Sequence, residues 1–583
     1  MNERYRTHTC GELRESDISA RAMLSGWVDT QRNHGGVIFV DLRDHYGVTQ
    51  LVLHDGSLLE GVTRETVICA SGTVVARDAE TYNPKLATGT VELLVDSVKI
   101  LSSAPAFLPF EVGNSDSVRE EARLKYRYLD LRGPRMQRNL RMRAELIHAL
   151  RENMEKLGFL EVQTPILTAS SPEGARDYLV PSRKFKGRFY ALPQAPQVFK
   201  QLLMLSGVDR YYQIAPCFRD EDARNDRSPG EFYQLDFEMA FATQDDVFQV
   251  AETVLYDVFT RFAPGHITGI TPPPFPRITY AQAMLRYGSD KPDLRNPLVI
   301  EDLTGFFADV DFKPFRGRPV RGIAVPGCAK QPKSFFEQML QFAEGIGMKG
   351  LGYISVGEDE LKGPIVKFLS EEKQQSLLKM MGMNVTDTVF FISDRPGLCD
   401  KLAGQIRNEL GRRLGLIDKT RFAFCFITDF PMYEIDSETK KLGFTHNPFS
   451  MPQGGLEALL AKDPLEILAY QYDIVVNGTE LSSGAVRNHM PEIMRKAFEI
   501  AGYGEEELKR RFGALYTAFQ HGAPPHAGMA PGLDRMLMLL LEEDSIREVA
   551  AFPMNGNAQD LLLGAPGEVT EQQLREVHIK VRN

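Results

Sequence analysis

Short alternations of apolar and polar residues dominate the N-terminal part of the chain. In "VIFVDLR" (37–43), Ile38, Val40 and Leu42 share one face, and Phe39 shares the other with polar residues, because side chains alternate along a strand. Turn-rich sequences such as "RNHGG" and "HYG" separate these runs. The pattern predicts a small β-barrel over residues 1–104.

Phe39 is an aromatic residue on the polar face of its predicted strand. An exposed aromatic side chain on a small β-barrel is a stacking platform for a nucleic-acid base. A neighbouring loop or domain that covers the ring would explain it equally well, and the pattern leaves both readings open.

The rest of the chain divides into four further segments. A proline-rich stretch without periodicity (102–117) predicts a linker, and we assign residues 105–140 to a linker or hinge. A helix follows, with Gly158 as its stop and apolar residues at helical spacing, namely Leu146, Ile147, Leu150, Met154 and Leu157. Mixed strands and helices over 294–418 predict an inserted domain that separates residues 141–293 from residues 419–583.

A charge-rich stretch, "CFRDEDARNDRSPGEF" (217–232), lies between two β-like runs and predicts a hairpin with a long loop. In the second run, Gln234, Asp236 and Glu238 share one face. One amide and two carboxylates beside an arginine-rich loop suit a cationic ligand group. Arg219, at the root of the loop, has a fork that suits phosphate or carboxylate.

A second candidate site is the predicted hairpin "YDIVVNGTELSSGAVRNH" (472–489). Asn477-Gly478 is the strongest short-range signal for a two-residue type I′ turn. This register places Glu480 on the same face as Asp473, within reach of a shared ion. The pair suits Mg²⁺ that carries substrate phosphates, unless it is an unrelated pair on a solvated hairpin.

A third candidate is "HAGMAPGLDRM", in which Pro531-Gly532 precedes an apolar helix that starts near Leu533. Arg535 lies in the first turn, where free backbone N–H groups already favour anions. An arginine there opposes the helix dipole, and a bound anion such as phosphate would compensate for it.

Composition and charge limit the classes of protein to which this chain can belong. The 583 residues are 43% hydrophobic and 25% charged, which is typical of a soluble multidomain protein. The net charge of −10 argues against indiscriminate nucleic-acid binding, whereas the basic stretch 119–143 is either a solvated helix face or a track for a phosphate backbone. The chain lacks P-loop and Rossmann fingerprints and an obvious nucleophile triad.

Cysteine usage and the N-terminus predict a cytoplasmic location. Six scattered cysteines form no CxxC pair, so a disulfide framework and a structural zinc site are not expected. The N-terminal residues contain no apolar core of a secretory signal, and the longest apolar run near the C-terminus, "MLMLLL", is too short to span a bilayer.

Taken together, these motifs resemble those of the class II aminoacyl-tRNA synthetases. "EVQTPIL" resembles motif 1, "CFRDEDARNDRSPGEFYQLDFE" resembles motif 2 and "GMAPGLDRM" resembles motif 3. The stretches "SPEGARDYLVPSR", "QAPQVFKQLLM", "YGSDKPDLR" and "THNPFSMP" narrow the resemblance to the bacterial aspartyl-tRNA synthetase family, over essentially the whole chain.

The resemblance implies the fold and the reaction. Residues 1–104 would be an OB-fold anticodon-binding domain, 141–293 and 419–583 an α+β catalytic domain on an antiparallel sheet, and 294–418 an α+β GAD-type insertion. Aspartate would attack the α-phosphorus of ATP to give aspartyl-adenylate, and tRNA(Asp) would then accept the aspartyl group. Such chemistry needs positioning and charge neutralisation rather than a protein nucleophile. Motif 1 also implies a homodimer.

The resemblance also implies roles for individual residues, with Arg219 and Arg535 as the catalytic pair. The ATP-binding set is Arg219, Asp220, Glu221, Glu480, Gly532, Leu533, Asp534 and Arg535. The aspartate-binding set is Glu173, Gln197, Lys200, Arg219, Asp236, His446 and Arg487. Asp473 and Glu480 would hold Mg²⁺, and the anticodon-reading set is Arg32, His34, Phe39 and Gln50.

The choice of substrates has alternatives. His34 matches a position at which relaxed-specificity relatives commonly carry His, so aspartylation of both tRNA(Asp) and tRNA(Asn) is expected, with strict tRNA(Asp) specificity as the alternative. Asparaginyl-tRNA synthetase is a rival, although burying the cations Lys200 and Arg487 against a neutral amide would be costly. A non-catalytic RNA-binding paralogue is a third alternative. The presence of four charged residues argues against it, namely Arg219, Arg535, Asp473 and Glu480.

Overall fold

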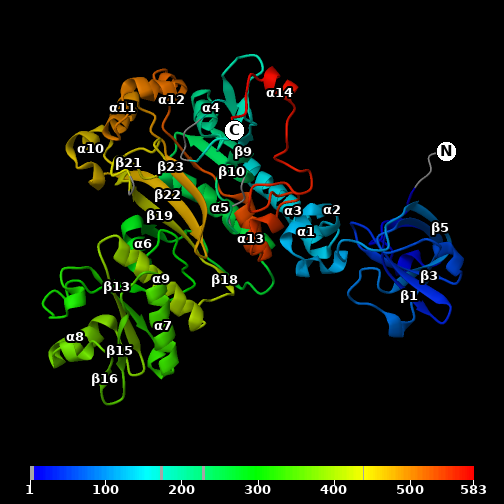
Figure 1. The fold of residues 1–583 in the computed structure, drawn as a ribbon, viewed down its shortest axis with the longest axis horizontal. Helices are drawn as coiled ribbons and strands as arrows, with labels where there is room; N and C mark the ends of the chain where they lie inside the picture. The colour runs from blue at the N-terminus through cyan, green and yellow to red at the C-terminus, as the bar shows by residue number, and fades with distance from the viewer. Residues whose placement is uncertain (1–4, 171–174, 226–229, 437–438, 583) are drawn as a thin grey trace. The chain divides into compact units, whose positions relative to one another are not determined.

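The structure is a computed structural model that describes residues 5–170, 175–225, 230–436 and 439–582. The chain forms two compact units, which Figure 1 colours by residue number. The first comprises Met1–Arg138 with Asp560–Ala565, and the second comprises Asn139–Gln559 with Pro566–Asn583. Among the described helices, none combines the length and the apolar character that crossing a bilayer requires.

The first unit contains the predicted β-barrel. It is closed, and its strands follow the order β1 (Arg21–His34), β2 (Val37–Arg43), β3 (Val48–Leu53), β5 (Val91–Ser102) and β4 (Val67–Ala76). Ile38, Val40 and Leu42 are buried in its core, and Phe39 lies on the opposite face of β2. The alternation along β2 is therefore confirmed.

The segment after the barrel is more ordered than the linker reading of residues 105–140 implies. It contains short helices, namely η4 (Val112–Ser117), α1 (Glu120–Lys125) and α2 (Arg127–Asp130). Arg123 and Arg127 are buried and both bind the buried carboxylate of Asp130, at 3.3 and 2.5 Å. Part of the basic stretch is thus an internal ion-pair cluster, which neither sequence reading anticipated.

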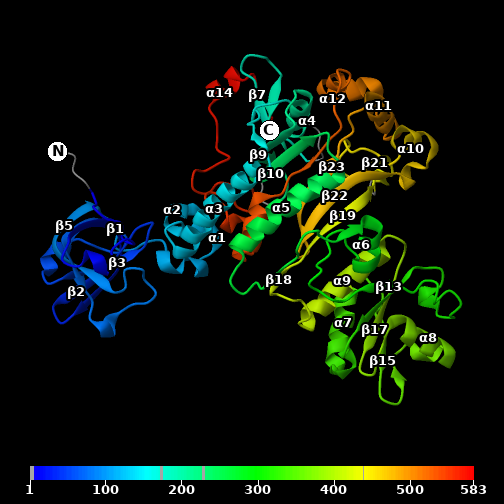
Figure 2. The ribbon, with the colours of Figure 1, turned by 180° about the vertical axis from the view of Figure 1, so that it is seen from behind.

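An eight-stranded, mainly antiparallel sheet organises the second unit. In order across the sheet, its strands are β12 (Arg277–Thr279), β19 (Phe424–Pro431), β22 (Leu468–Val476), β23 (Thr479–Val486), β24 (His526–Met529), β10 (Gly230–Ala240), β9 (Arg210–Arg219) and β6 (Leu160–Glu161). The helices α3 (Pro134–Lys156), α5 (Gln244–Phe262) and α13 (Leu533–Leu541) pack on one face in the main apolar core. Figure 2 shows α5 lying across this face.

The other elements of the second unit surround this sheet. The further helices are α4 (Gln197–Leu205), α10 (Gly455–Ala461), α11 (Pro491–Ile500), α12 (Glu505–Phe519) and α14 (Glu571–Glu576). The two-stranded ribbons are β7 (Leu179–Pro181) with β8 (Phe189–Ala191), β11 (Gly269–Ile270) with β18 (Arg421–Phe422), and β20 (Tyr433–Ile435) with β21 (Leu442–Phe444). The predicted helix is confirmed within α3, and Gly158 follows it with a left-handed φ of 79°.

The predicted insertion is an α+β body with its own antiparallel sheet. The strand order is β13 (Ile300–Asp302), β14 (Val320–Val325), β17 (Thr388–Ser393), β15 (Gly352–Val356) and β16 (Leu361–Lys362). Its helices are α7 (Lys333–Gly345), α8 (Glu371–Met381) and α9 (Leu398–Arg413). Successive residues Phe390 and Phe391 enter two different apolar clusters, because neighbouring side chains of a strand point to opposite faces.

The junction between this insertion and the sheet depends on a pair of glycines. Gly288 ends α6 (Tyr280–Tyr287) with a φ of 67°, and its backbone lies against Gly404 of α9. A Cβ on Gly288 would meet the Asp400 carbonyl oxygen at 2.3 Å and the Gly404 nitrogen at 2.4 Å. Only glycine therefore allows α6 and α9 to approach this closely.

We expect Gly288→Ala to lower the free energy of unfolding of the second unit by at least about 2 kcal/mol, because it adds a left-handed penalty to a backbone clash. Urea and thermal unfolding of the full chain measure this. Gly305→Ala is the matched control, since a Cβ there meets nothing within 4 Å. Equal effects of the two substitutions would contradict the close-packing argument.

Candidate active site and nucleic-acid face

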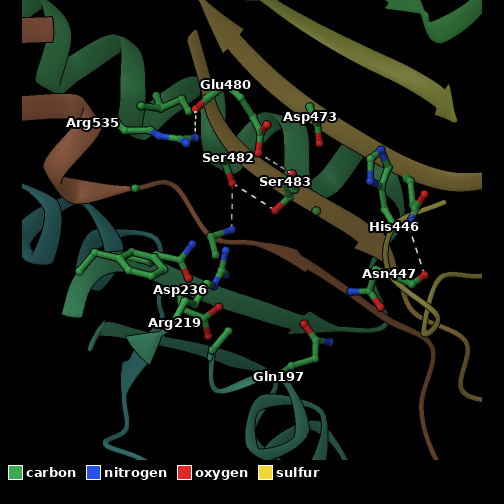
Figure 3. A pocket seen from close by; sticks show the side chains of 18 of the residues that line it. Gln197, Arg219, Asp236, His446, Asn447, Asp473, Glu480, Ser482, Ser483 and Arg535 are labelled. Carbon is green, nitrogen blue, oxygen red and sulfur yellow. Dashed lines mark hydrogen bonds between the residues drawn. The ribbon is translucent and has the colours of Figure 1, made fainter. Parts of the chain in front are cut away.

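A cavity of about 580 Å³ opens on the face of the sheet opposite the main core (Figure 3). Its walls come from β9, β10, β22 and β23, from the first turns of α4 and α13, and from the loop 444–448. Of the predicted site residues, the cavity brings together Gln197, Lys200, Arg219, Glu221, Asp236, His446, Asp473, Glu480, Arg487, Gly532, Asp534 and Arg535. Motifs 2 and 3 therefore meet in one place.

A chain of four buried charges forms the floor of the cavity. Lys200 Nζ lies 2.6 Å from Asp236 Oδ1 and 3.5 Å from Glu238 Oε2. Arg487 donates to both oxygens of Glu238, from Nε at 2.8 Å and from Nη2 at 3.2 Å. Asp236 and Glu238 are both 0% exposed, and their two negative charges balance the two cations.

Burial and these partners shift the pKa values of the two carboxyl groups in opposite directions. Burial works to raise the pKa of Glu238, but Arg487 and then Lys200 outweigh it and hold that pKa below its usual value. Burial raises the pKa of Asp236, and Lys200 only partly offsets it. The charged form of Glu238 is therefore stabilised by its partners. The charged form of Asp236 is less well stabilised, so Asp236 can accept a ligand cation more readily.

A buried polar atom beside this floor is unsatisfied. Within the described residues, Gln197 Nε2 has no acceptor, whereas the Asp236 carboxylate has the Tyr211 hydroxyl beside it. Gln197 is 6% exposed, and its side chain lines the cavity. A buried polar atom without a partner costs roughly 1–3 kcal/mol, so Gln197 indicates a polar ligand that supplies an acceptor.

The carboxylate pair lies on the predicted hairpin of β22 and β23. Asn477 and Gly478 both have positive φ, at 52° and 80°, and Val475 pairs with Glu480, which confirms the type I′ turn and its register. A bulge then shifts the pairing, so that Asp473 faces Ser483, whose hydroxyl donates to Glu480 Oε1 at 3.1 Å.

The two carboxylates of this hairpin influence each other strongly. Burial and then the charge of Glu480 raise the pKa of Asp473. Burial also works to raise the pKa of Glu480, but Lys291 and Arg535 outweigh it and lower that pKa. Lys291 Nζ lies 3.2 Å from Glu480 Oε2 and 2.7 Å from Asp290 Oδ2.

Two arginines stand on opposite walls of the cavity (Figure 3). Arg219 ends β9, with its guanidinium 4.9 Å from the centre of the Phe232 ring. Arg535, in the first turn of α13, donates from Nη1 to the Glu480 carbonyl at 2.5 Å. The aromatic ring and the carbonyl orient the two cations, and both guanidinium groups line the cavity.

Among the described residues of the second unit, two predicted site residues lie outside the cavity lining. Leu533 is 0% exposed in the main apolar core, so its side chain does not line the cavity, because the first turn of α13 turns it away from Asp534 and Arg535. Asp220 also lies outside the lining and faces Arg176 at 3.8 Å. Glu173 lies outside the described residues.

The motif 3 aspartate is tied to both other motif regions. Asp534 Oδ2 accepts from the Tyr233 backbone N–H at 2.9 Å, and Oδ1 accepts from Arg143 Nη1 at 2.5 Å. Asp534 thus contributes to the wall mainly by holding β10 and α3 against α13.

His446 lines the opposite end of the cavity. Burial and then the charge of Lys291 lower the pKa of this histidine.

The predicted anticodon-reading residues gather on one face of the barrel. Arg32 lies opposite Phe39 in the pairing of β1 with β2 and donates to Asp41 at 3.0 Å and to Gln50 at 3.5 Å. The rings of His34 and Phe39 meet edge to face, with centroids 6.0 Å apart. Cationic, amide and aromatic groups on one barrel face are typical of single-stranded nucleic-acid binding.

The ion pairs of two site residues were not predicted from the sequence. Glu238 was predicted to help form a floor for a cationic ligand group, but it instead holds Lys200 and Arg487. Lys291 lies in the quoted stretch "YGSDKPDLR", but nothing in the pattern pointed to Glu480. The alternation of β10, with two acidic residues on one face, was a signal that could have pointed to Glu238. No comparable signal pointed to Lys291.

Solved structures with a similar fold include two synthetases. A putative aspartyl-tRNA synthetase from Leishmania major aligns with a TM-score of 0.59 at 20% identity, over 95% of each chain. An asparaginyl-tRNA synthetase from Pyrococcus horikoshii, in complex with asparaginyl-adenylate, aligns with a TM-score of 0.57 at 18% identity, over 94% of this chain and 97% of that one. At these identities the likeness concerns the fold.

Sequence comparisons identify the family. The model "tRNA synthetases class II (D, K and N)" matches residues 119–556, and the model "OB-fold nucleic acid binding domain" matches residues 23–101. An aspartate--tRNA ligase of Streptomyces coelicolor is 55% identical over 99% of both chains. An aspartate--tRNA(Asp/Asn) ligase of Acidiphilium cryptum is 55% identical over 99% of this chain and 98% of its own. The chain therefore belongs to the aspartate--tRNA ligase family of class II tRNA synthetases.

Proposed function

We propose that this chain joins L-aspartate to tRNA(Asp) and to tRNA(Asn), in a first step with ATP and a second step with the tRNA 3′ end. The observation that carries the amino-acid assignment is the buried chain of Asp236, Lys200, Glu238 and Arg487. Family membership supports the reaction, and the relatives include ligases named for tRNA(Asp) alone and for tRNA(Asp/Asn).

Charge balance in the floor favours aspartate over asparagine. The ammonium group of the substrate would bind Asp236, and its side-chain carboxylate would bind Lys200 and Arg487, since all three residues line the cavity. One added positive and one added negative charge keep this buried site neutral. Asparagine would add the positive charge alone, and an uncompensated buried charge costs several kcal/mol.

The first step then needs positioning and charge neutralisation. Arg219 would hold the α-carboxylate of aspartate beside the α-phosphate of ATP, and Arg535 would bind the γ-phosphate, with Glu221 and Gly532 along the nucleotide. A carboxylate oxygen bonds to the α-phosphorus, and the bond from that phosphorus to the bridging oxygen breaks, which releases pyrophosphate. The two oriented guanidinium groups support this assignment, because fixed cations stabilise charge that spreads over phosphoryl oxygens.

Asp473 and Glu480 fit a magnesium site. The two carboxylates repel each other, and burial and then the charge of Glu480 raise the pKa of Asp473. A cation beside the pair would relieve this repulsion. Mg²⁺ is usually held by one or two carboxylates together with substrate phosphates. When bound, the ion would neutralise the phosphates of ATP, while Arg535 keeps its backbone contact at Glu480.

The barrel face would read the anticodon. Phe39 offers a ring for stacking, and Arg32 and Gln50 offer hydrogen-bonding groups on the same face. His34, exposed at the end of β1 and in contact with the Phe39 ring, would decide how strictly tRNA(Asp) is separated from tRNA(Asn).

Assembly and location complete the proposal. Exposed apolar residues, namely Leu160, Ile166 and Leu167, follow α3 within the stretch that resembles motif 1, and a second copy of the chain would cover them in a homodimer. No disulfide joins the cysteines within the described residues, and this agrees with a cytoplasmic location.

Aspartate-dependent ATP–pyrophosphate exchange tests the amino-acid assignment. We expect exchange with aspartate and none with asparagine. Exchange with asparagine alone would reverse the assignment, and exchange with neither would favour a non-catalytic RNA-binding protein.

Arg487→Met should lower kcat/KM for aspartate by about three orders of magnitude, because the substrate loses a charged partner and Glu238 loses its bidentate cation. The exchange assay measures this at saturating ATP. The control is Arg495→Met, whose side chain is half exposed on α11, and it should leave kcat/KM unchanged. A loss of less than about tenfold would remove Arg487 from aspartate recognition.

His34→Leu should reduce aspartylation of tRNA(Asn) at least about tenfold relative to tRNA(Asp), because the imidazole beside Phe39 is lost. Initial rates with the two purified tRNAs measure the ratio, and His54→Leu, at another exposed barrel position, is the control. If the unchanged protein aspartylates tRNA(Asn) thousands of times more slowly than tRNA(Asp), the relaxed specificity is wrong.

A further inference from the structure

Lys291 supplies a positive charge at the carboxylate pair of the β22–β23 hairpin. Its Nζ lies 3.2 Å from Glu480 Oε2 and 2.7 Å from Asp290 Oδ2, and its side chain is 35% exposed. These two ion pairs place the positive charge of Lys291 beside the same carboxylates to which a divalent cation is assigned.

The segment that carries Lys291 is held by a buried arginine of the inserted domain. Arg407 of α9 is 1% exposed. Its guanidinium donates to three backbone carbonyls of the segment, those of Leu298 at 2.6 Å, Asn296 at 2.8 Å and Asp293 at 3.0 Å. Three charge-assisted bonds to carbonyls within six residues fix a backbone path that has no regular secondary structure of its own.

Close backbone contacts hold the same segment at both ends. Gly288 lies against Gly404 of α9, as described above, and a Cβ on Gly411 would meet the Asn296 side chain at 2.3 Å. A Cβ on Gly478, in the turn of the carboxylate hairpin, would meet Asp293 Cβ at 3.2 Å. The segment is thus packed between α9 and the hairpin turn, which places Lys291 beside Glu480.

The position of Lys291 matters because of the chemistry of the Asp473–Glu480 pair. Two carboxylates that converge across a hairpin need a cation, and either an ammonium or a divalent ion can provide one. Both cations need the oxygens of Glu480, so the ammonium contact must weaken when those oxygens coordinate a metal ion.

We propose that Lys291 is a built-in counter-ion of the Asp473–Glu480 pair, which competes with a divalent cation for these carboxylates when no nucleotide is bound. The inserted domain serves to hold it there. The inference rests on the proposed assignment of this pair to Mg²⁺. It follows that the free ion binds weakly by itself, and that phosphate oxygens from the nucleotide lower the ion concentration at which the lysine is displaced.

Binding of Mn²⁺ alone, followed by the electron paramagnetic resonance signal of the free ion, tests the competition without any turnover. In the full-length protein, Lys291→Met should bind Mn²⁺ about tenfold more tightly than the unchanged chain, because the internal competitor is gone. Lys291→Arg retains the charge and should restore weak binding. Lys333→Met is the matched control, since Lys333 is 91% exposed on α7, and it should change nothing.

The outcomes separate the two assignments. If Lys291→Met leaves the Mn²⁺ affinity unchanged or weakens it, while Glu480→Gln abolishes binding, the counter-ion role is wrong and the metal site stands. If Glu480→Gln binds Mn²⁺ as the unchanged protein does, the metal assignment fails and the inference fails with it.

Amine acylation of the unchanged protein, read by peptide mass spectrometry, tests the same point without a variant. Adding Mg²⁺ alone at a saturating concentration should raise the acylation of Lys291 several-fold and leave that of Lys333 constant, because a displaced amine is more accessible to the reagent. Equal acylation of Lys291 with and without Mg²⁺ would overturn the proposal.

Discussion

The bonds that Glu238 makes to Lys200 and Arg487 constrain the catalytic unit more than any other interaction in it. Glu238 on β10 and Arg487 just after β23 are separated by the short strand β24, and Lys200 reaches them from α4. An unpaired charge in this buried floor would cost several kcal/mol, so the three elements are fixed in one arrangement. Beside that arrangement, Gln197 lines the cavity and its buried Nε2 has no acceptor within the described residues.

The cost of an unbalanced buried charge also governs the other wall of the cavity. Asp473 and Glu480 converge because a type I′ turn and a bulge set the register of their hairpin, and the resulting repulsion must be relieved by a cation. Lys291 relieves part of it, and Arg407 of the inserted domain binds backbone carbonyls of the segment that follows Lys291. The structural role proposed for the insertion rests on these contacts near the site.

Several features were predictable because they depend on neighbours within one element. Alternation fixed the buried and outer faces of β2, the Asn477-Gly478 pair set the register of the hairpin, and Gly158 marked the end of a helix. The motif order predicted that Arg219 and Arg535 share a cavity. Local signals also misled, since Leu533 follows the motif 3 glycine but packs into the core, and Arg123 and Arg127 bind an internal carboxylate.

The sequence by itself determined the strand faces, the turn, the family and most of the residues that line the cavity, because period and motif spacing constrain residues that are close along the chain. Only the tertiary structure decided which charges meet. Arg487 and Glu238 are 249 residues apart, and Lys291 and Glu480 come from different segments on either side of the insertion. No periodicity links such residues, and their pairing follows from the sheet order and from the packing of α9 against the segment that carries Lys291.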